Sequence, residues 1–218
     1  MRLSIGDMAP ATTLQTIRGE HLTVPDASAR FVHLQFRRFA GCPVCNFHLL
    51  SLAGRRKDIE AAGIREVILF HSSQREMLKY QAQLPFDCVA DPTKQHYRRF
   101  GVQTSGLAVL HPRVFWSGVR WILTTGRFYN KAENGILGLP ADFLVDSRGH
   151  VVAAKYGLHA DDHWDADELL SLASRVCRGD DADATDVQQH LRVRVPSFAG
   201  TRAGRKPVLE GTSPSSGQ

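Results

Sequence analysis

The stretch that decides the fold is Phe36-Arg37-Arg38-Phe39-Ala40-Gly41-Cys42-Pro43-Val44-Cys45. An apolar run ends in this stretch and a long helical pattern begins in it, and two cysteines separated by two residues stand at the junction. A thiol at the start of a helix faces unpaired backbone N–H groups and the positive end of the helix dipole. This environment favours the thiolate, which is the reactive form of cysteine. The stretch therefore predicts a dithiol redox protein, with Cys42 as the nucleophile and Cys45 as its resolving partner.

The residues on either side of the dithiol predict a strand before it and a helix after it. Residues 30–36 are dominated by Phe, Val and Leu, as strands often are. Residues 43–62 read as a helix, and Pro43 suits its first turn, where no intrahelical donor is lost. The positions of this helix expected to face the core are Leu49, Leu50, Leu52 and Ala53. Residues 66–71 contain a second apolar run, which is typical of a strand buried on both faces in a β-α-β unit.

The remaining pattern predicts one domain at 1–177 followed by a flexible tail at 178–218. Residues 12–17 and 21–24 are strand-like and are separated by a turn at Gly19, which predicts a hairpin. Further strands are expected at 86–90, 139–146 and 150–156, and further helices at 74–83, 94–100 and 165–177. Residues 102–138 carry no readable period and are expected to be a variable insertion. The tail is rich in Gly, Ser, Pro and Arg, a composition typical of mobile segments.

The composition disfavours several other classes of protein. The formal charge of +5 is modest and no nucleic-acid motif accompanies it, so nucleic-acid binding is disfavoured. The four cysteines, at positions 42, 45, 88 and 177, are too few for a disulfide scaffold and lack the second close pair of a structural zinc site. We expect neither a metal nor a cofactor. No apolar run is long enough to span a membrane, and residues 1–10 lack a secretory pattern, so we expect a cytoplasmic protein.

Three further motifs resemble those of one redox family. Gly6-Asp7-Met8-Ala9-Pro10 resembles the G-D-x-A-P start of redoxin domains, and Asp91-Pro92-Thr93 with Tyr97, Phe100, Gly101 and Val102 resembles their D-P…Y…F-G-V segment. The stretch Gly138-Leu139-Pro140-Ala141-Asp142-Phe143-Leu144-Val145-Asp146-Ser147-Arg148-Gly149 is similar to their G-x-P-x-x-F-L-I-D-x-x-G strand and turn. Together these motifs resemble the AhpC/TSA group of peroxiredoxin-like proteins over about residues 3–177.

This resemblance implies a fold and a set of roles. The implied fold is a thioredoxin-like α/β/α sandwich with a central mixed sheet, an N-terminal β-hairpin extension and a C-terminal tail. The resemblance places Cys42 at the peroxidatic position and makes Pro140 the match of a cis-proline beside the dithiol. Two positions depart from the peroxiredoxin signature Pro-x-x-x-Thr-x-x-Cys, because the threonine position is Phe39 and the proline position is Gln35. Thioredoxins carry tryptophan immediately before the first cysteine, where this chain has Gly41.

The side chains near the dithiol have competing interpretations. Arg37 and Arg38 would lower the pKa of Cys42 if they approached it, but successive strand residues point to opposite faces, so at most one is expected at the site. We take Arg38 as a supporting residue with Pro43, Pro140 and Gly41, and solvated arginines are the alternative. His48 is expected to be a surface or packed histidine rather than a proton shuttle. The sequence predicts that Cys88 lies in the core, and it assigns Cys177 no role.

We expect a thiol-dependent antioxidant oxidoreductase that reduces hydroperoxides through a Cys42–Cys45 dithiol/disulfide cycle. A thioredoxin- or glutathione-type reductant would restore the dithiol. Two alternatives stay open. One is a protein-disulfide reductase that uses the same cysteines, and the other is a non-catalytic thioredoxin-fold binding module. A homodimer also stays open, and no membrane partner is expected.

Overall fold

The computed structural model describes residues 2–102, 133–135 and 138–179. Most of the predicted insertion at 102–138 and nearly all of the predicted tail at 178–218 therefore lie outside the described residues. The described strands are β1 (Thr12–Gln15), β2 (His21–Val24), β3 (Phe31–Arg37), β4 (Ile64–Phe70), β5 (Asp87–Ala90), β6 (Ala141–Asp146) and β7 (Val151–Tyr156). The described helices are α1 (Pro43–Gly54), α2 (Arg56–Ala61), α3 (Gln74–Tyr80), α4 (Gln95–Arg99) and α6 (Ala166–Arg178).

A five-stranded mixed sheet forms the centre of the fold, with the strand order β5-β4-β3-β6-β7. The central strand β3 pairs in parallel with β4 and antiparallel with β6. The strands β1 and β2 form the separate antiparallel hairpin expected around Gly19. The predicted α/β fold with a mixed sheet and an N-terminal hairpin is confirmed, and Cys42 follows the carboxyl end of the central strand.

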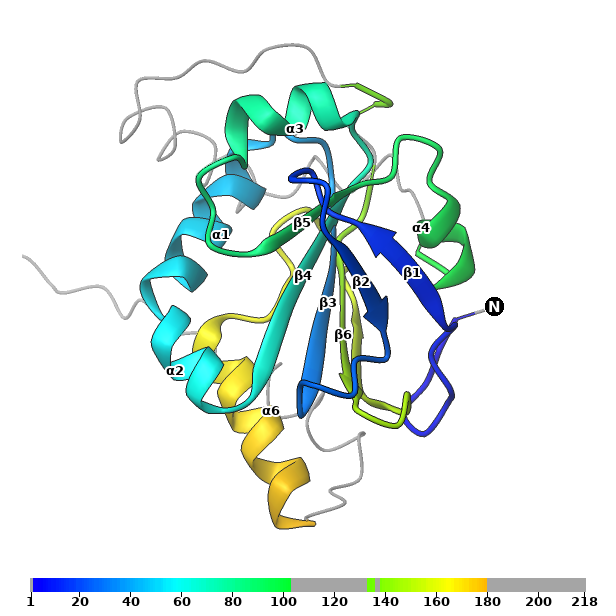
Figure 1. The fold of residues 1–218 in the computed structure, drawn as a ribbon, viewed down its shortest axis with the longest axis vertical. Helices are drawn as coiled ribbons and strands as arrows, with labels where there is room; N and C mark the ends of the chain where they lie inside the picture. The colour runs from blue at the N-terminus through cyan, green and yellow to red at the C-terminus, as the bar shows by residue number, and fades with distance from the viewer. Residues whose placement is uncertain (1, 103–132, 136–137, 180–218) are drawn as a thin grey trace, which may run out of the picture. The chain divides into compact units, whose positions relative to one another are not determined.

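One apolar cluster of the core joins residues of the central sheet, the hairpin and α4, and Figure 1 shows the hairpin and α4 on the same side of the sheet. Successive strand residues point to opposite faces, so Val32, Leu34 and Phe36 of β3 all reach this core. Each of these three side chains is nearly or completely inaccessible to solvent. Helices α1, α2 and α6 lie on the opposite side of the sheet (Figure 1), which gives the layered arrangement expected of this fold class.

The other face of β3 is buried and, from His33 to Arg37, polar. His33 Nδ1 lies 2.9 Å from Glu66 Oε2, and its Nε2 lies 3.1 Å from Asp142 Oδ1. Arg37 Nη2 donates to Asp142 Oδ1 at 2.7 Å, and Gln35 Nε2 donates to Glu66. Buried charges are tolerated when they are paired and hydrogen-bonded, and this network meets that condition.

The network also shifts the protonation of its members. Burial would lower the pKa of His33, but the negative charge of Glu66 and the hydrogen bond to Asp142 outweigh burial and raise that pKa to about 9. Burial would raise the pKa of Asp142, but the charge of Arg37 and the bond from His33 lower it. His33 is therefore a buried cation at neutral pH, which the sequence analysis did not predict.

The helix expected at 43–62 is in fact two helices, and one of its inward positions was wrong. Arg55 separates α1 from α2, with φ −108° and ψ 14°, and its N–H donates to Leu52 O three residues back. This tight turn ends α1. Leu49 and Leu52 are buried as predicted, whereas Leu50 is 52% exposed. Each residue advances the helix by about 100°, so Leu50 lies beside the buried stripe rather than in it.

The expected cis bond before Pro140 is also wrong. The cis peptide bond in the described ranges precedes Pro25, so the Leu139–Pro140 bond is trans. A trans bond keeps the chain extended, and Ala141 pairs with Phe36 of β3 directly after it. The carbonyl of Pro140 accepts a hydrogen bond from Gly157 N–H at 2.9 Å. Pro140 thus directly precedes β6.

Candidate active site

The dithiol lies at the junction that the sequence predicted. Cys42 is the N-cap of α1, with extended backbone angles (φ −63°, ψ 114°), and Pro43 occupies the first turn of the helix. Cys42 O accepts the first helical hydrogen bond, from Asn46 N–H at 3.0 Å. The Cys42 sulfur caps the helix, because it accepts a hydrogen bond from Cys45 N–H at 3.5 Å. A serine or aspartate oxygen commonly makes this bond at a helix start.

The two sulfurs are in contact and are reduced. Cys42 Sγ and Cys45 Sγ lie 2.9 Å apart, both residues are free cysteines, and both are fully buried. Burial alone would raise the pKa of Cys42. The hydrogen bond from the Cys45 thiol and the positive charge of Arg38 outweigh burial and lower that pKa to about 6. Burial and the adjacent Cys42 thiolate together raise the pKa of Cys45 well above its ordinary value. The pair therefore holds one thiolate and one thiol at neutral pH.

Arg38 is the cation that faces the site. Its Nη2 donates to Cys42 Sγ at 3.3 Å, and the residue is only 4% exposed. The guanidinium carbon lies 5.4 Å from the centre of the Phe39 ring, which is cation–π distance. The aromatic residue that replaces the family's threonine thus helps to fix the arginine that contacts the thiolate. Arg37 points to the polar network instead, as strand alternation required, and it is buried rather than solvated.

Three polar side chains hold the loop before Cys42 in place. Asn46 Nδ2 donates to Ala40 O at 2.7 Å and to Cys42 O at 2.9 Å. Gln81 Nε2 donates to Ala40 O at 2.8 Å and to Asn46 Oδ1 at 2.7 Å. Ser72 Oγ accepts from Ala40 N–H at 3.0 Å. These bonds satisfy buried backbone groups and fix the position of Cys42.

Gly41 packs closely against Tyr80. A Cβ atom at this position would lie 3.2 Å from Tyr80 Cζ and 3.3 Å from its hydroxyl oxygen. A side chain at residue 41 would therefore require the Tyr80 ring, at the end of α3, to shift slightly. This contact gives a physical reason for glycine before the first cysteine.

A histidine that the sequence analysis did not single out lies next to Arg38. His71 follows directly after β4, is 1% exposed, and donates its backbone N–H to Arg38 O at 3.2 Å. The carboxyl ends of parallel strands meet at one edge of a sheet, so its place after the β4 apolar run was the signal that could have found it.

The contacts described for the other predicted residues are with groups other than the two sulfurs. His48 is packed, as expected, with its ring 3.6 Å from the ring of His163. Cys88 is buried in β5, where burial raises its pKa to about 12, and Cys177 is exposed. The contacts described for Pro140 are with Gly157, so its expected position beside the dithiol stays a prediction.

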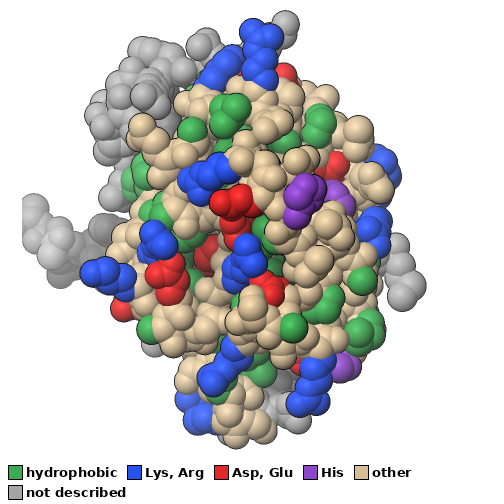
Figure 2. All heavy atoms as spheres, viewed as in Figure 1, with side chains coloured by type: hydrophobic (Ala, Val, Ile, Leu, Met, Phe, Trp, Pro, Cys, Tyr) green, Lys and Arg blue, Asp and Glu red, His purple; other side chains and the backbone are tan. Residues whose placement is uncertain are grey.

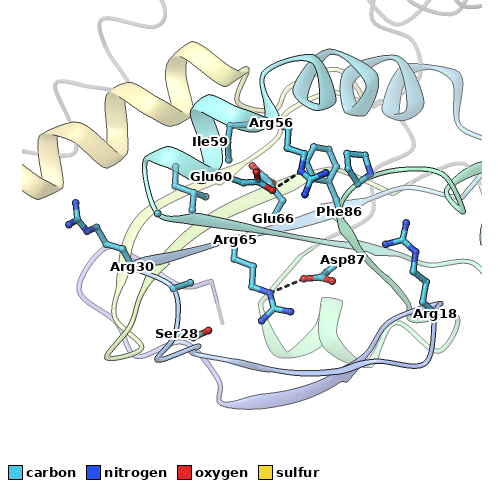
Figure 3. A pocket seen from close by; sticks show the side chains of 14 residues that line it. Arg18, Ser28, Arg30, Arg56, Ile59, Glu60, Arg65, Glu66, Phe86 and Asp87 are labelled. Atoms are coloured by element: carbon cyan, nitrogen blue, oxygen red, sulfur yellow. Dashed lines mark hydrogen bonds and ion pairs between the residues drawn. The ribbon is translucent and has the colours of Figure 1, made fainter.

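A cavity of about 420 Å³ lies at the other end of the sheet, around the start of β4. Figure 3 shows Arg65 pointing to Asp87 and Arg56 pointing to Glu60, and these pairs lie 2.8 and 2.6 Å apart. Because β3 and β4 are parallel and the dithiol follows the end of β3, the cavity and the dithiol lie at opposite ends.

The surface charge does not gather into a single patch on the face shown in Figure 2, where basic and acidic side chains are interspersed. Within the described residues, no three His, Cys, Asp or Glu side chains come together as a metal site would require. No helix in the described part of the chain is long and apolar enough to cross a membrane.

The family model named "AhpC/TSA family" matches residues 5–154 of the chain. The chain belongs to the AhpC/TSA family. It is therefore a thiol peroxidase or thiol–disulfide oxidoreductase with a thioredoxin-like fold. The resemblance expected from the sequence motifs is confirmed.

Relatives and solved structures agree with this membership. Two curated sequences from strains of Mycobacterium tuberculosis, named as proposed peroxiredoxins, are each 24% identical over 164 residues, or 74% of this chain and 90% of theirs. The peroxidoxin BcpB from M. tuberculosis has a TM-score of 0.59 at 16% identity over 80% of this chain and 99% of its own. A proposed thiol:disulfide interchange protein DsbE from Chlorobium tepidum has a TM-score of 0.52 at 20% identity, over 78% and 99%. The structural likenesses concern the fold.

Proposed function

We propose that the chain reduces hydroperoxides through Cys42 and Cys45. The observation that carries this proposal is the contact of Cys42 Sγ with both Arg38 Nη2 and the Cys45 thiol, which lowers the pKa of Cys42 to about 6. At neutral pH the nucleophile is then mostly thiolate without any base to deprotonate it.

The cycle begins with attack of the Cys42 thiolate on one peroxide oxygen. The S–O bond forms, the O–O bond breaks, and the departing oxygen takes up a proton, which gives a sulfenic acid and an alcohol or water. Cys45 then attacks the sulfenic sulfur, water leaves, and the Cys42–Cys45 disulfide forms. The thiolate charge on Cys42 helps to hold the pKa of Cys45 high. Oxidation of Cys42 removes this charge, so Cys45 ionises more easily at the step in which it must attack.

A thioredoxin- or glutathione-type thiol system in the cytoplasm is the proposed source of the two electrons that reduce the disulfide. Such systems keep thiols reduced in that compartment. The contact distance of 2.9 Å between the sulfurs favours an intramolecular disulfide over a bond to a second subunit.

A second candidate function is reduction of another protein's disulfide. The Cys-x-x-Cys pair and the fold shared with the DsbE protein favour it. Burial of Cys42 Sγ favours the peroxide instead, because a small oxidant needs less opening than a protein disulfide aligned with the sulfur.

The experiment is to react the reduced protein with hydrogen peroxide, with cumene hydroperoxide and, separately, with insulin. Rapid loss of two thiols with either peroxide, abolished in Cys42→Ser, supports the proposal. Slow reaction with both peroxides but rapid insulin reduction would replace it with the second candidate.

A further inference from the structure

Several buried polar atoms of Arg38, which contacts the thiolate, and of its neighbour His71 lack hydrogen-bond partners among the residues that the structure describes. Arg38 uses Nη2 on Cys42, but its Nε and Nη1 have no partner. Both ring nitrogens of His71 are also buried without a hydrogen-bond partner. Leaving a buried donor or acceptor without a partner costs about 1–3 kcal/mol of folding free energy. Such groups therefore indicate a place where a ligand could supply the missing hydrogen bonds.

Gly138 packs closely against both residues. A Cβ atom on Gly138 would lie 3.0 Å from His71 Nε2 and 3.7 Å from Arg38 Cγ. A side chain at residue 138 would therefore crowd the imidazole, and glycine leaves its Nε2 uncovered by a side chain from this position. The backbone of Gly138 is outside the left-handed region, so its conformation does not itself demand glycine.

The protonation of His71 suits a neutral hydrogen-bonding role. Burial, and then the positive charge of Lys94, lower its pKa to about 4, and Arg38 acts in the same direction. A neutral imidazole carries one N–H donor and one acceptor nitrogen. The site thus offers an uncharged donor next to the cation that holds the thiolate.

We propose that His71 is a catalytic residue that donates a hydrogen bond to the departing oxygen of the hydroperoxide, together with the unpartnered N–H groups of Arg38. This inference rests on the proposed peroxidase function. As sulfur attacks the distal oxygen, the O–O electron pair moves to the RO⁻ leaving group, and negative charge develops there. Arg38 and the His71 N–H stabilise that charge until the oxygen takes up a proton from water. A donor aimed at developing charge is worth about 10²–10³ in rate in comparable sites.

The test uses two oxidants whose leaving groups differ in basicity. tert-Butyl hydroperoxide releases a strongly basic alkoxide, whereas peroxynitrous acid releases nitrite, which needs little stabilisation. The second-order rate constants for oxidation of Cys42 are measured by quenched flow and thiol counting in wild type, His71→Phe and His71→Gln. Ultraviolet titration of the thiolate and far-ultraviolet circular dichroism check that the nucleophile and the fold are intact.

We expect His71→Phe to slow the reaction with tert-butyl hydroperoxide by about 10²-fold and to leave the peroxynitrite reaction within about twofold. His71→Gln keeps an N–H donor and should recover part of the loss. Gly138→Ala, whose methyl group would crowd His71 Nε2, should slow the hydroperoxide reaction without shifting the thiolate titration. Equal slowing with both oxidants, or no slowing with either, would overturn the role of His71. If wild type reacts with no peroxide faster than free cysteine does, the proposed function itself fails.

Discussion

Replacing Arg38 by methionine removes the cation from the thiolate while keeping an unbranched side chain. The lost interaction is a charge-assisted hydrogen bond at 3.3 Å in a buried setting. Hydrogen bonds to charged groups are worth about 1.5–3 kcal/mol, which corresponds to about one to two units of pKa. The pKa of Cys42 should then rise from about 6 toward 7 or 8 as the charge of Arg38 is lost.

The assay is the rate of alkylation of Cys42 by iodoacetamide between pH 5 and 9.5. At pH 6 about half of the wild-type Cys42 is thiolate, so Arg38→Met should be slower by about 5- to 50-fold, and the two rates should converge near pH 9.5. Arg98→Met, at an exposed arginine of α4, is the matched control and should follow the wild-type curve. Superimposable profiles for Arg38→Met and wild type would refute the argument that Arg38 activates the nucleophile.

Three further predictions follow from other contacts. Cys45→Ala removes the thiol that donates to Cys42, so the pKa of Cys42 should rise by about half to one unit in the same assay; an unchanged value would show that the thiol hydrogen bond is unimportant. Gly41→Ala should lower the free energy of unfolding by about 1 kcal/mol through its tight contact with Tyr80, and urea unfolding should show a smaller added cost of this change in a Tyr80→Ala background. Additive costs would argue against this contact. Glu66 and Asp142 raise the pKa of His33 against the effect of burial. This raised pKa contributes folding stability that is complete below pH 6.5 and is lost as pH rises through about 9. The measurement uses the Cys42→Ser background, because the Cys42 thiolate makes stability rise with pH and would mask the effect. In this background the free energy of unfolding should fall by up to about 3 kcal/mol between pH 6.5 and 9, and adding His33→Gln should abolish the fall.

The parts of the structure that depend on neighbouring residues could be predicted from the sequence. The helix start at Cys42 depends on the adjacent Pro43 and on the N–H of Cys45, and the strands are continuous or alternating apolar runs. Family motifs then supplied the mixed sheet. The same local reasoning failed at Leu50, because helical periodicity alone does not show how wide the buried stripe is.

The interactions that join distant residues could not be predicted. His33 and Arg37 looked like ordinary strand positions, and their partner Asp142 is 109 and 105 residues away in the sequence. His71 joins Arg38 only because β4 lies beside β3. The cis bond expected at Pro140 came from the family resemblance rather than from local chemistry, and the extended start of β6 does not need it.

The most direct test of the peroxidase cycle is mass spectrometry of the protein after one equivalent of hydrogen peroxide. Wild type should lose two hydrogen atoms, with the loss mapped to a peptide that joins Cys42 to Cys45. Cys45→Ser should instead gain one oxygen atom on Cys42, which dimedone traps as a sulfenic acid, and Cys42→Ser should do neither. Oxidation that falls on Cys88 or Cys177, or a Cys42 that stays reduced while peroxide persists, would contradict the account.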